Sequence, residues 1–175
     1  MAKDENKERI ALFPGSFDPF TIGHQSLVKR GLDLADKMII AVGINEKKQS
    51  YFPAKERMES IQRLYADNPR VEVRSYQTLT TDLAQETHAD FILRGIRSVI
   101  DFEYEKTIAD INRTLTGIET VFLLAEPQYA HISSSAVREL LFFEKEVSSF
   151  LPEGMRIEEQ HIIVDRLTRK QVDKG

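Results

Sequence analysis

Five short apolar runs alternate with segments of helical periodicity in this chain, and this alternation is the feature that most restricts its fold. The runs cover residues 10–13, 38–42, 71–76, 91–93 and 121–124. Apolar residues recur at helical spacing in the segments near 21–35, 53–67, 81–87, 102–115 and 133–143. Short apolar strands that alternate with helices predict an α/β protein, with a parallel sheet covered by helices on both faces.

Local sequence signals mark where several of these elements begin and end. Asp101 is expected to cap the helix of residues 102–115, and Gly117 to stop it. Asp82 or a neighbouring threonine is expected to cap the helix near 81–87. Pro53 fits the first turn of the helix that follows it.

The chain is long enough for one domain with a full core, since it has 175 residues of which 41% are hydrophobic. Residues 1–8 are expected to form a loose polar tail, and residues 9–152 a single domain. Residues 153–175 are expected to be a C-terminal extension, for which periodicity allows either a helix or a strand.

Composition excludes several classes of protein. The net charge is −4 and no basic block exceeds two residues, so a nucleic-acid partner is not expected. The absence of cysteine excludes disulfides and thiol catalysis. No apolar run reaches the roughly 18 residues of a membrane span. The polar start of the chain lacks the apolar core of a signal peptide, which favours a cytoplasmic protein.

The loop after the first apolar run combines groups suited to binding an anion. Pro14 and Gly15 end the predicted strand, and the next helix starts near Thr21 with His24 in its first turn. A helix start offers free N–H groups and a positive dipole end. Ser16 adds a hydroxyl to the same loop. We therefore expect an anion site here, although a lone histidine is more often structural.

Polar side chains also follow the other predicted strands, whose carboxyl ends share one edge of the sheet. They are Lys48, Thr78, Thr80, Arg94, Arg97 and the serines Ser133, Ser134 and Ser135. In a net-acidic protein this concentration favours a polyanionic ligand such as a nucleoside triphosphate. The alternatives are a solvated lysine pair, arginines that pair with nearby carboxylates, and serines that only cap a helix.

Five short motifs of the sequence resemble those of a known superfamily and of one family within it. Gly15–Pro19 (GSFDP) and Thr21–His24 (TIGH) resemble the nucleotidyltransferase superfamily. RGIR at 94–97 with DFEYE at 101–105, and ISSS at 132–135, are similar to the phosphopantetheine adenylyltransferase family. The resemblance covers about residues 10–152.

The resemblance implies a fold, a reaction and partners. The fold would be a Rossmann-like, doubly wound, five-stranded parallel sheet with strand order 3-2-1-4-5. The reaction would transfer AMP from ATP to 4′-phosphopantetheine, giving dephospho-coenzyme A and pyrophosphate. The cofactor would be Mg²⁺. We expect the substrate phosphates to hold it, with no metal ligand from the protein, because the sequence shows no Asp/Glu/His cluster with metal-ligand spacing. Coenzyme A would act as a feedback inhibitor, and the assembly would be a homohexamer.

The resemblance also implies roles for individual residues. His24, Lys48 and Arg97 would be catalytic, with His24 stabilising the transition state. Ser16, Lys48, Thr80 and Arg94 would bind phosphopantetheine; many relatives carry a larger apolar residue in place of Thr80. The residues that would bind ATP are Ser16, Phe17, His24, Gly95, Ile96, Arg97, Glu105, Tyr129, Ala130, His131, Ile132, Ser133, Ser134 and Ser135.

Two other functions compete with this interpretation. One is a nucleotidyltransferase that acts on glycerol phosphate or a nicotinate ribotide. The other is a non-catalytic nucleotide-binding regulator, which would not need Lys48 and Arg94 aimed at a second phosphate. A covalent enzyme intermediate is not expected, because the serines show no adjacent His–Asp arrangement to activate them.

Overall fold

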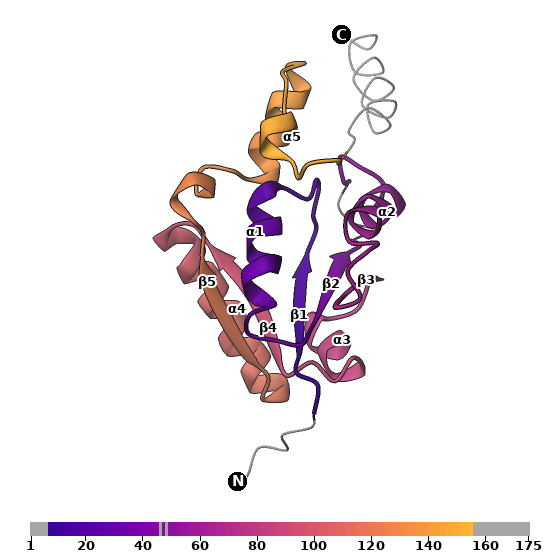
Figure 1. The fold of residues 1–175 in the computed structure, drawn as a ribbon. Coiled ribbons are helices and arrows are strands. Elements are labelled where there is room, and N and C mark those ends of the chain that lie inside the picture. The colour runs from indigo at the N-terminus through magenta and orange to yellow at the C-terminus, as the bar shows by residue number, and fades with distance from the viewer. Residues whose placement is uncertain (1–6, 46, 48, 156–175) are drawn as a thin grey trace.

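The computed structural model describes residues 7–45, 47 and 49–155, which form a five-stranded parallel sheet flanked by helices (Figure 1). The sheet order is β3-β2-β1-β4-β5. The strands are β1 (Ile10–Gly15), β2 (Lys37–Gly43), β3 (Val71–Tyr76), β4 (Phe91–Ile96) and β5 (Glu119–Leu124). The helices are α1 (Ile22–Gly31), α2 (Ala54–Leu64), α3 (Thr80–Glu86), α4 (Val99–Thr116) and α5 (Ser134–Phe142), with single turns at Pro127–Tyr129 and Ser148–Phe150. The predicted α/β class and strand order are confirmed.

Two apolar layers hold the helices to the sheet. On one face, Leu27 and Val28 of α1 and Ile61 of α2 pack against the sheet in a cluster that includes Phe13 and Ile40. On the other face, Leu83 and Ala84 of α3 pack against a cluster with Leu12, Ile39 and Ile92. Because side chains alternate along a strand, successive residues of β1 and β2 supply opposite layers. Burial on both faces explains why these strands read as unbroken apolar runs.

Strand β4 is longer than the sequence predicts. The apolar run ends at Leu93, but the parallel ladder with β5 continues through Arg94, Gly95 and Ile96. Backbone pairing with β5 does not depend on an apolar side chain, so the pattern could not mark this end. Arg94 therefore projects from the strand itself and does not follow it.

Two predicted helix caps are wrong. Helix α4 begins at Val99, and the Ser98 hydroxyl caps it by accepting from the backbone N–H of Asp101 at 3.2 Å. Asp101 lies in the first turn, where its carboxylate faces Arg97. Helix α3 begins at Thr80 after Leu79, which makes no side-chain cap. The predicted stop of α4 is confirmed, since Gly117 is left-handed with φ 75°.

A third apolar cluster fixes α5 beyond the carboxyl ends of the strands (Figure 1). Val137 and Leu141 of α5 pack with Phe52, Val147 and Leu151. Helix α5 thereby stands over the loops that follow β1 and β2.

Within the described residues, no helix is long and apolar enough to cross a membrane. The predicted extension lies outside the described residues from position 156 onward.

Candidate active site

Two cavities open at the carboxyl ends of the strands and share one wall. The larger, of about 850 Å³, lies between β1, β2 and β4 and the helices α3 and α4. The smaller, of about 300 Å³, lies between α1, the end of β4 and the start of α5. Pro14, Gly15, Ser16, Arg94 and Glu105 line both cavities. Ligands in the two cavities would therefore meet at Ser16 and Arg94.

His24 lines the smaller cavity from the first turn of α1. The backbone N–H of Thr21 donates to His24 Nδ1 at 2.9 Å, and the Thr21 hydroxyl accepts from the His24 N–H at 3.4 Å. Since Nδ1 is occupied as an acceptor, a neutral ring carries its proton on Nε2. The ring is then oriented and offers one N–H donor.

Burial keeps His24 neutral. Desolvation, with smaller contributions from the Arg94 and Arg97 charges, lowers the pKa of His24 from 6.5 to about 3. The ring contacts Phe17 edge-on, with centroids 5.1 Å apart, and lies 5.3 Å from the ring of Phe20. These rings exclude water from one side of the imidazole.

Phe17, in the loop after β1, packs closely against Gly15, the last residue of that strand. Phe17 has φ 46°, a left-handed conformation that is unusual for an aromatic residue. Its ring lies over Gly15 so closely that a Cβ there would be 2.8 Å from Phe17 Cζ. This packing holds Ser16 between them, exposed on the shared wall.

Arg94 and Glu105 form a bidentate ion pair on the shared wall. Arg94 Nε donates to Glu105 Oε2 at 2.7 Å and Nη2 donates to Oε1 at 2.5 Å. Arg94 Nη1 also donates to the carbonyl of Pro14. Burial works to lower the pKa of Arg94, but Glu105 outweighs it and the pKa is raised. The predicted alternative of an arginine–carboxylate pair is thus realised, yet two guanidinium protons remain for a ligand.

Arg97 is held beside the smaller cavity by two partners. Its Nε donates to Asp101 Oδ2 at 3.1 Å, and its Nη1 lies 3.5 Å from the carbonyl oxygen of Ile132. The side chain thereby links the end of β4 to the segment that leads into α5. Arg97 and Ile132 both line the cavity, as does Tyr129.

The three serines make three different contacts at the start of α5. Ser133 is the N-cap and accepts from the Ala136 N–H at 3.1 Å, so the predicted capping role is confirmed. Ser134 donates to the carbonyl of Pro19 at 2.8 Å. Ser135 accepts from Arg138 at 3.1 Å. All three serines line the smaller cavity, which faces the N-terminus of α5.

The larger cavity contains Thr80 and Lys47. The Thr80 and Tyr76 hydroxyls are 3.0 Å apart, which makes this part of the wall polar. Lys47 lies at the rim, exposed to solvent. Lys48, predicted to bind the acceptor phosphate, lies outside the described residues.

Three predicted nucleotide contacts are not among the residues that line either cavity. Ile96 is buried at the end of β4, where its carbonyl accepts from the Ala125 N–H at 2.8 Å. Ala130 and His131 are exposed, and the His131 ring lies 6.3 Å from that of Phe150. Their roles in nucleotide binding stay predictions. Gly95 does line the smaller cavity, where a Cβ would come 2.3 Å from Leu27 Cδ1.

Arg138 is a cation of this site that the sequence analysis did not single out. It lines the smaller cavity and donates to the carbonyl of Asp18 at 2.7 Å as well as to Ser135. A basic residue three positions after Ser135, on the same helix face, was the available signal.

Comparison with known proteins agrees with this geometry. A family model described as cytidylyltransferase-like matches residues 12–140. The chain is 59% identical over 149 residues to a phosphopantetheine adenylyltransferase of Bacteroides thetaiotaomicron, covering 85% of this chain and 99% of that protein. It is 59% identical over 150 residues to the protein of that name in Phocaeicola vulgatus (86% and 99% covered). The corresponding protein of Flavobacterium johnsoniae is 47% identical over 149 residues (85% and 98% covered).

The Rossmann-like sheet and the paired cavities at its carboxyl edge define a cytidylyltransferase-like nucleotidyltransferase. Within that class, the identity and coverage of these relatives show the particular family. The chain belongs to the phosphopantetheine adenylyltransferase family.

Proposed function

We propose that this chain transfers the adenylyl group of ATP to 4′-phosphopantetheine, forming dephospho-coenzyme A and releasing pyrophosphate. Family membership gives the reaction. The observation that carries it in this molecule is the shared wall of Ser16, Arg94 and Glu105 between two cavities. A two-substrate transfer requires such a meeting point.

The nucleotide would occupy the smaller cavity, and the acceptor the larger one. An oxygen of the acceptor phosphate would attack the α-phosphorus of ATP, forming a new P–O bond. The bond from that phosphorus to the bridging oxygen would break on the opposite side, and pyrophosphate would leave with the bonding pair. His24 would donate from Nε2 to a phosphate oxygen whose charge changes in the transition state.

No general base is needed for this attack. A phosphate monoester has its second pKa near 6, so the acceptor is mostly dianionic at pH 7. The difficulty is repulsion between two polyanions, which Lys48, Arg94, Arg97 and Arg138 would offset. Positioning and charge neutralisation are most of what such a transfer asks of a protein.

Magnesium would be held by the substrate phosphates. In the described part of the chain, no group of three or more metal-ligating side chains is present. The carboxylates that line the nucleotide cavity, Asp101 and Glu105, each accept hydrogen bonds from an arginine. Because these carboxylates are already paired, we expect Mg²⁺ to arrive bound to the nucleotide. The ion would then neutralise part of the negative charge of the nucleotide.

We propose self-association, with the homohexamer as the assembly that the resemblance implies. Helix α4 (Val99–Thr116) contains no buried residue. Its exposed apolar side chains include Val99 (75% exposed), Ile100 (80%) and Tyr104 (67%). A contiguous apolar face of this kind is typical of an interface. Sedimentation of the wild type and of Ile100→Lys tests it, since a monomeric wild type would contradict self-association.

Coenzyme A is proposed as an inhibitor, because it carries both an adenylate and a pantetheine arm and could span both cavities. The cytoplasm, which supplies ATP, is the proposed compartment.

The function is tested by pyrophosphate release. ATP is mixed with 4′-phosphopantetheine, with glycerol 3-phosphate or with nicotinate mononucleotide, each with Mg²⁺. Release only with phosphopantetheine is expected. Release with one of the other acceptors would favour a different nucleotidyltransferase, and ATP binding without any release would favour a regulator.

A further inference from the structure

Arg57 of α2 is a buried charged residue that neither cavity uses directly. Only 3% of its surface is exposed, and in the described part of the chain no carboxylate forms an ion pair with it. Burial lowers the pKa of its guanidinium, and the charge of Asp18 opposes this. A buried charge without a direct counterion is costly unless hydrogen bonds satisfy it.

The Arg57 guanidinium donates to four acceptors: one in the loop after β1, one at the end of β2 and two in the loop that follows β2. Its Nη1 donates to the carbonyl of Ser16 and, at 3.3 Å, to that of Gly43. Its Nε donates to the carbonyl of Phe52 at 3.1 Å, and its Nη2 donates to the Ser50 hydroxyl at 3.2 Å. The planar fork of arginine suits this number of simultaneous contacts.

Two of these four acceptor residues, Ser16 and Gly43, line the larger cavity. Ser16 lies on the wall that both cavities share, and Gly43 is the last residue of β2. Ser50 and Phe52 lie at the far end of the loop that leaves Gly43 and carries Lys47. One side chain therefore joins the loop after β1 to both ends of the loop after β2.

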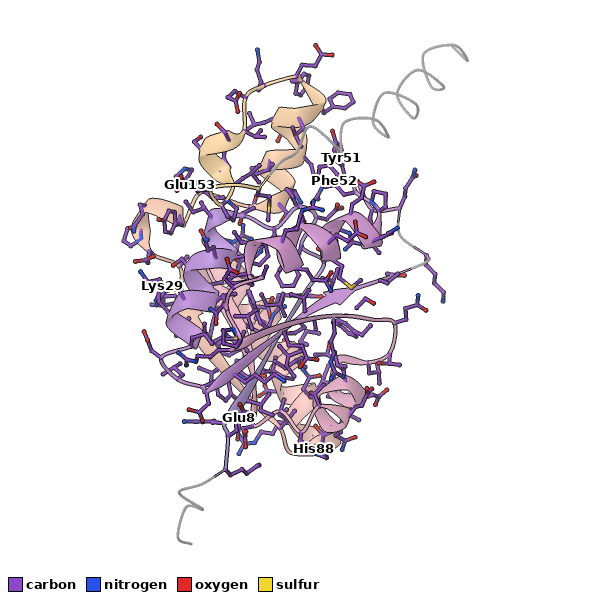
Figure 2. All side chains as sticks on the ribbon, turned by 45° about the vertical axis from the view of Figure 1, so that its right-hand side comes forward. Glu8, Lys29, Tyr51, Phe52, His88 and Glu153 are labelled. Carbon is purple, nitrogen blue, oxygen red and sulfur yellow. The ribbon has the colours of Figure 1, made fainter. Side chains whose placement is uncertain are left out.

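Asp18 completes the same attachment from the other loop. Its carboxylate accepts from the backbone N–H groups of Tyr51 and Phe52, each at 2.8 Å. Tyr51 and Phe52 lie together near α5 in Figure 2, with ring centroids 4.8 Å apart. The segment of residues 50–52 is thus held both by a buried cation and by a buried carboxylate.

We propose that Arg57 is a positioning residue for the transfer reaction: by holding the Ser16 carbonyl and both ends of the 43–52 loop, it sets where the acceptor phosphate meets the nucleotide. This inference rests on the proposed function. Arg57 lines neither cavity, so it acts through the backbone it binds. Small displacements matter at such a point, since a misplacement of ~1 Å can cost about 100-fold in rate.

Arg70 provides a control that makes similar contacts at a more exposed position. It donates to three backbone carbonyls, those of Leu32 (2.5 Å), Ala35 (2.7 Å) and Asp36 (2.9 Å). It lines neither substrate cavity. Arg70→Met therefore removes the same kind of contact from a part of the fold that holds no substrate loop.

The experiment compares Arg57→Met, Arg57→Lys and Arg70→Met by kcat, KM for each substrate and melting temperature. We expect kcat to fall by roughly 10- to 100-fold in both Arg57 variants, because lysine keeps the charge but cannot reach four acceptors. Arg70→Met should lower the melting temperature and leave kcat unchanged. Wild-type kcat in Arg57→Met, or full rescue by Arg57→Lys, would overturn the proposal.

Hydrogen exchange supplies a readout that needs no catalysis. The Tyr51 and Phe52 amides should exchange faster in Arg57→Lys than in the wild type or Arg70→Met; equal rates would overturn the inference. If Arg57→Met does not fold, Arg57→Lys decides the outcome by both readouts. A wild type that releases no pyrophosphate would count against the proposed function, while the exchange rates still decide the role of Arg57.

Discussion

Thr21 and His24 cap the start of α1 reciprocally. The Thr21 backbone N–H donates to His24 Nδ1 at 2.9 Å, and the Thr21 hydroxyl accepts from the His24 N–H at 3.4 Å. This exchange fixes the ring tautomer as well as the helix start. The histidine of the TIGH motif is therefore a neutral, oriented Nε2–H donor, and the threonine is part of the same device.

His24→Ala should lower kcat by ~10²–10³ while changing ATP affinity much less, because the donor is needed where charge changes during transfer. Single-turnover rates and calorimetric titration with ATP separate the two effects. His88→Asn is the control, since His88 lies in a turn away from both cavities with φ 53°, a conformation that asparagine tolerates. Near-normal turnover in His24→Ala would rule out the proposed role.

The stability of the ligand-free protein should depend on His24 in a defined pH window. Its pKa is about 3 when folded against 6.5 for the free side chain, so the unfolded chain binds the proton first as pH falls. The free energy of unfolding should decrease from pH 6.5 towards pH 3, with a slope of at most ~1.4 kcal/mol per pH unit from this group. Urea unfolding of the wild type and His24→Gln gives the difference; a difference that does not change with pH would contradict the shift.

Arg94→Ala and Lys48→Ala should raise KM for phosphopantetheine more than KM for ATP, since both are assigned to the acceptor phosphate. Arg94→Ala also leaves the Glu105 carboxylate unpaired, and this negative charge would repel the phosphate. Comparison with Arg94→Ala/Glu105→Gln isolates the lost cation from the unpaired anion. Arg113→Ala is the control, because its ion pair with Glu119 is exposed and outside both cavities. A loss confined to ATP would mean that the phosphate sites are assigned the wrong way round.

Gly95→Ala should destabilise the fold by about 1–3 kcal/mol, because the new Cβ would meet Leu27 Cδ1 at 2.3 Å, where α1 packs on β4. Thermal and urea unfolding measure the loss. Combining it with Leu27→Ala removes the clash, so the two losses should sum to more than the loss of the double variant. Strictly additive losses would show that the side chain of Leu27 is not the obstacle.

The transfer should invert the configuration at the α-phosphorus, because a single in-line displacement uses no covalent enzyme intermediate. The hydroxyls of Ser133, Ser134 and Ser135 contact the Ala136 N–H, the Pro19 carbonyl and the Arg138 guanidinium, and none of these partners is a histidine. ATP made chiral at that phosphorus reports the outcome. Retention of configuration would indicate an adenylyl-enzyme intermediate and would contradict this mechanism.

The sequence by itself determined the sheet and the edge at which the site forms. Apolar runs and helical spacing report local burial, and the carboxyl ends of parallel strands lie together whatever residues follow them. For that reason the sequence alone assigns several polar side chains to one edge of the sheet: Ser16, His24, Thr80, Arg97 and the serine run. The strand order came from the family resemblance, and residues 71–76 are a strand with the predicted bounds.

Only the tertiary structure decided the partners of the charged groups. Arg94 bonds to a residue 11 positions away and to Pro14, 80 positions away, and Arg57 reaches Ser16 across 41 positions. No periodicity records such pairs, because they depend on how separate loops approach in space. For the same reason the sequence does not show that His24 is neutral. Its lowered pKa comes from burial beside the rings of Phe17 and Phe20 and from the charges of Arg94 and Arg97. The sequence pattern places these side chains at one edge of the sheet. Tertiary packing then determines their protonation state, tautomer and orientation.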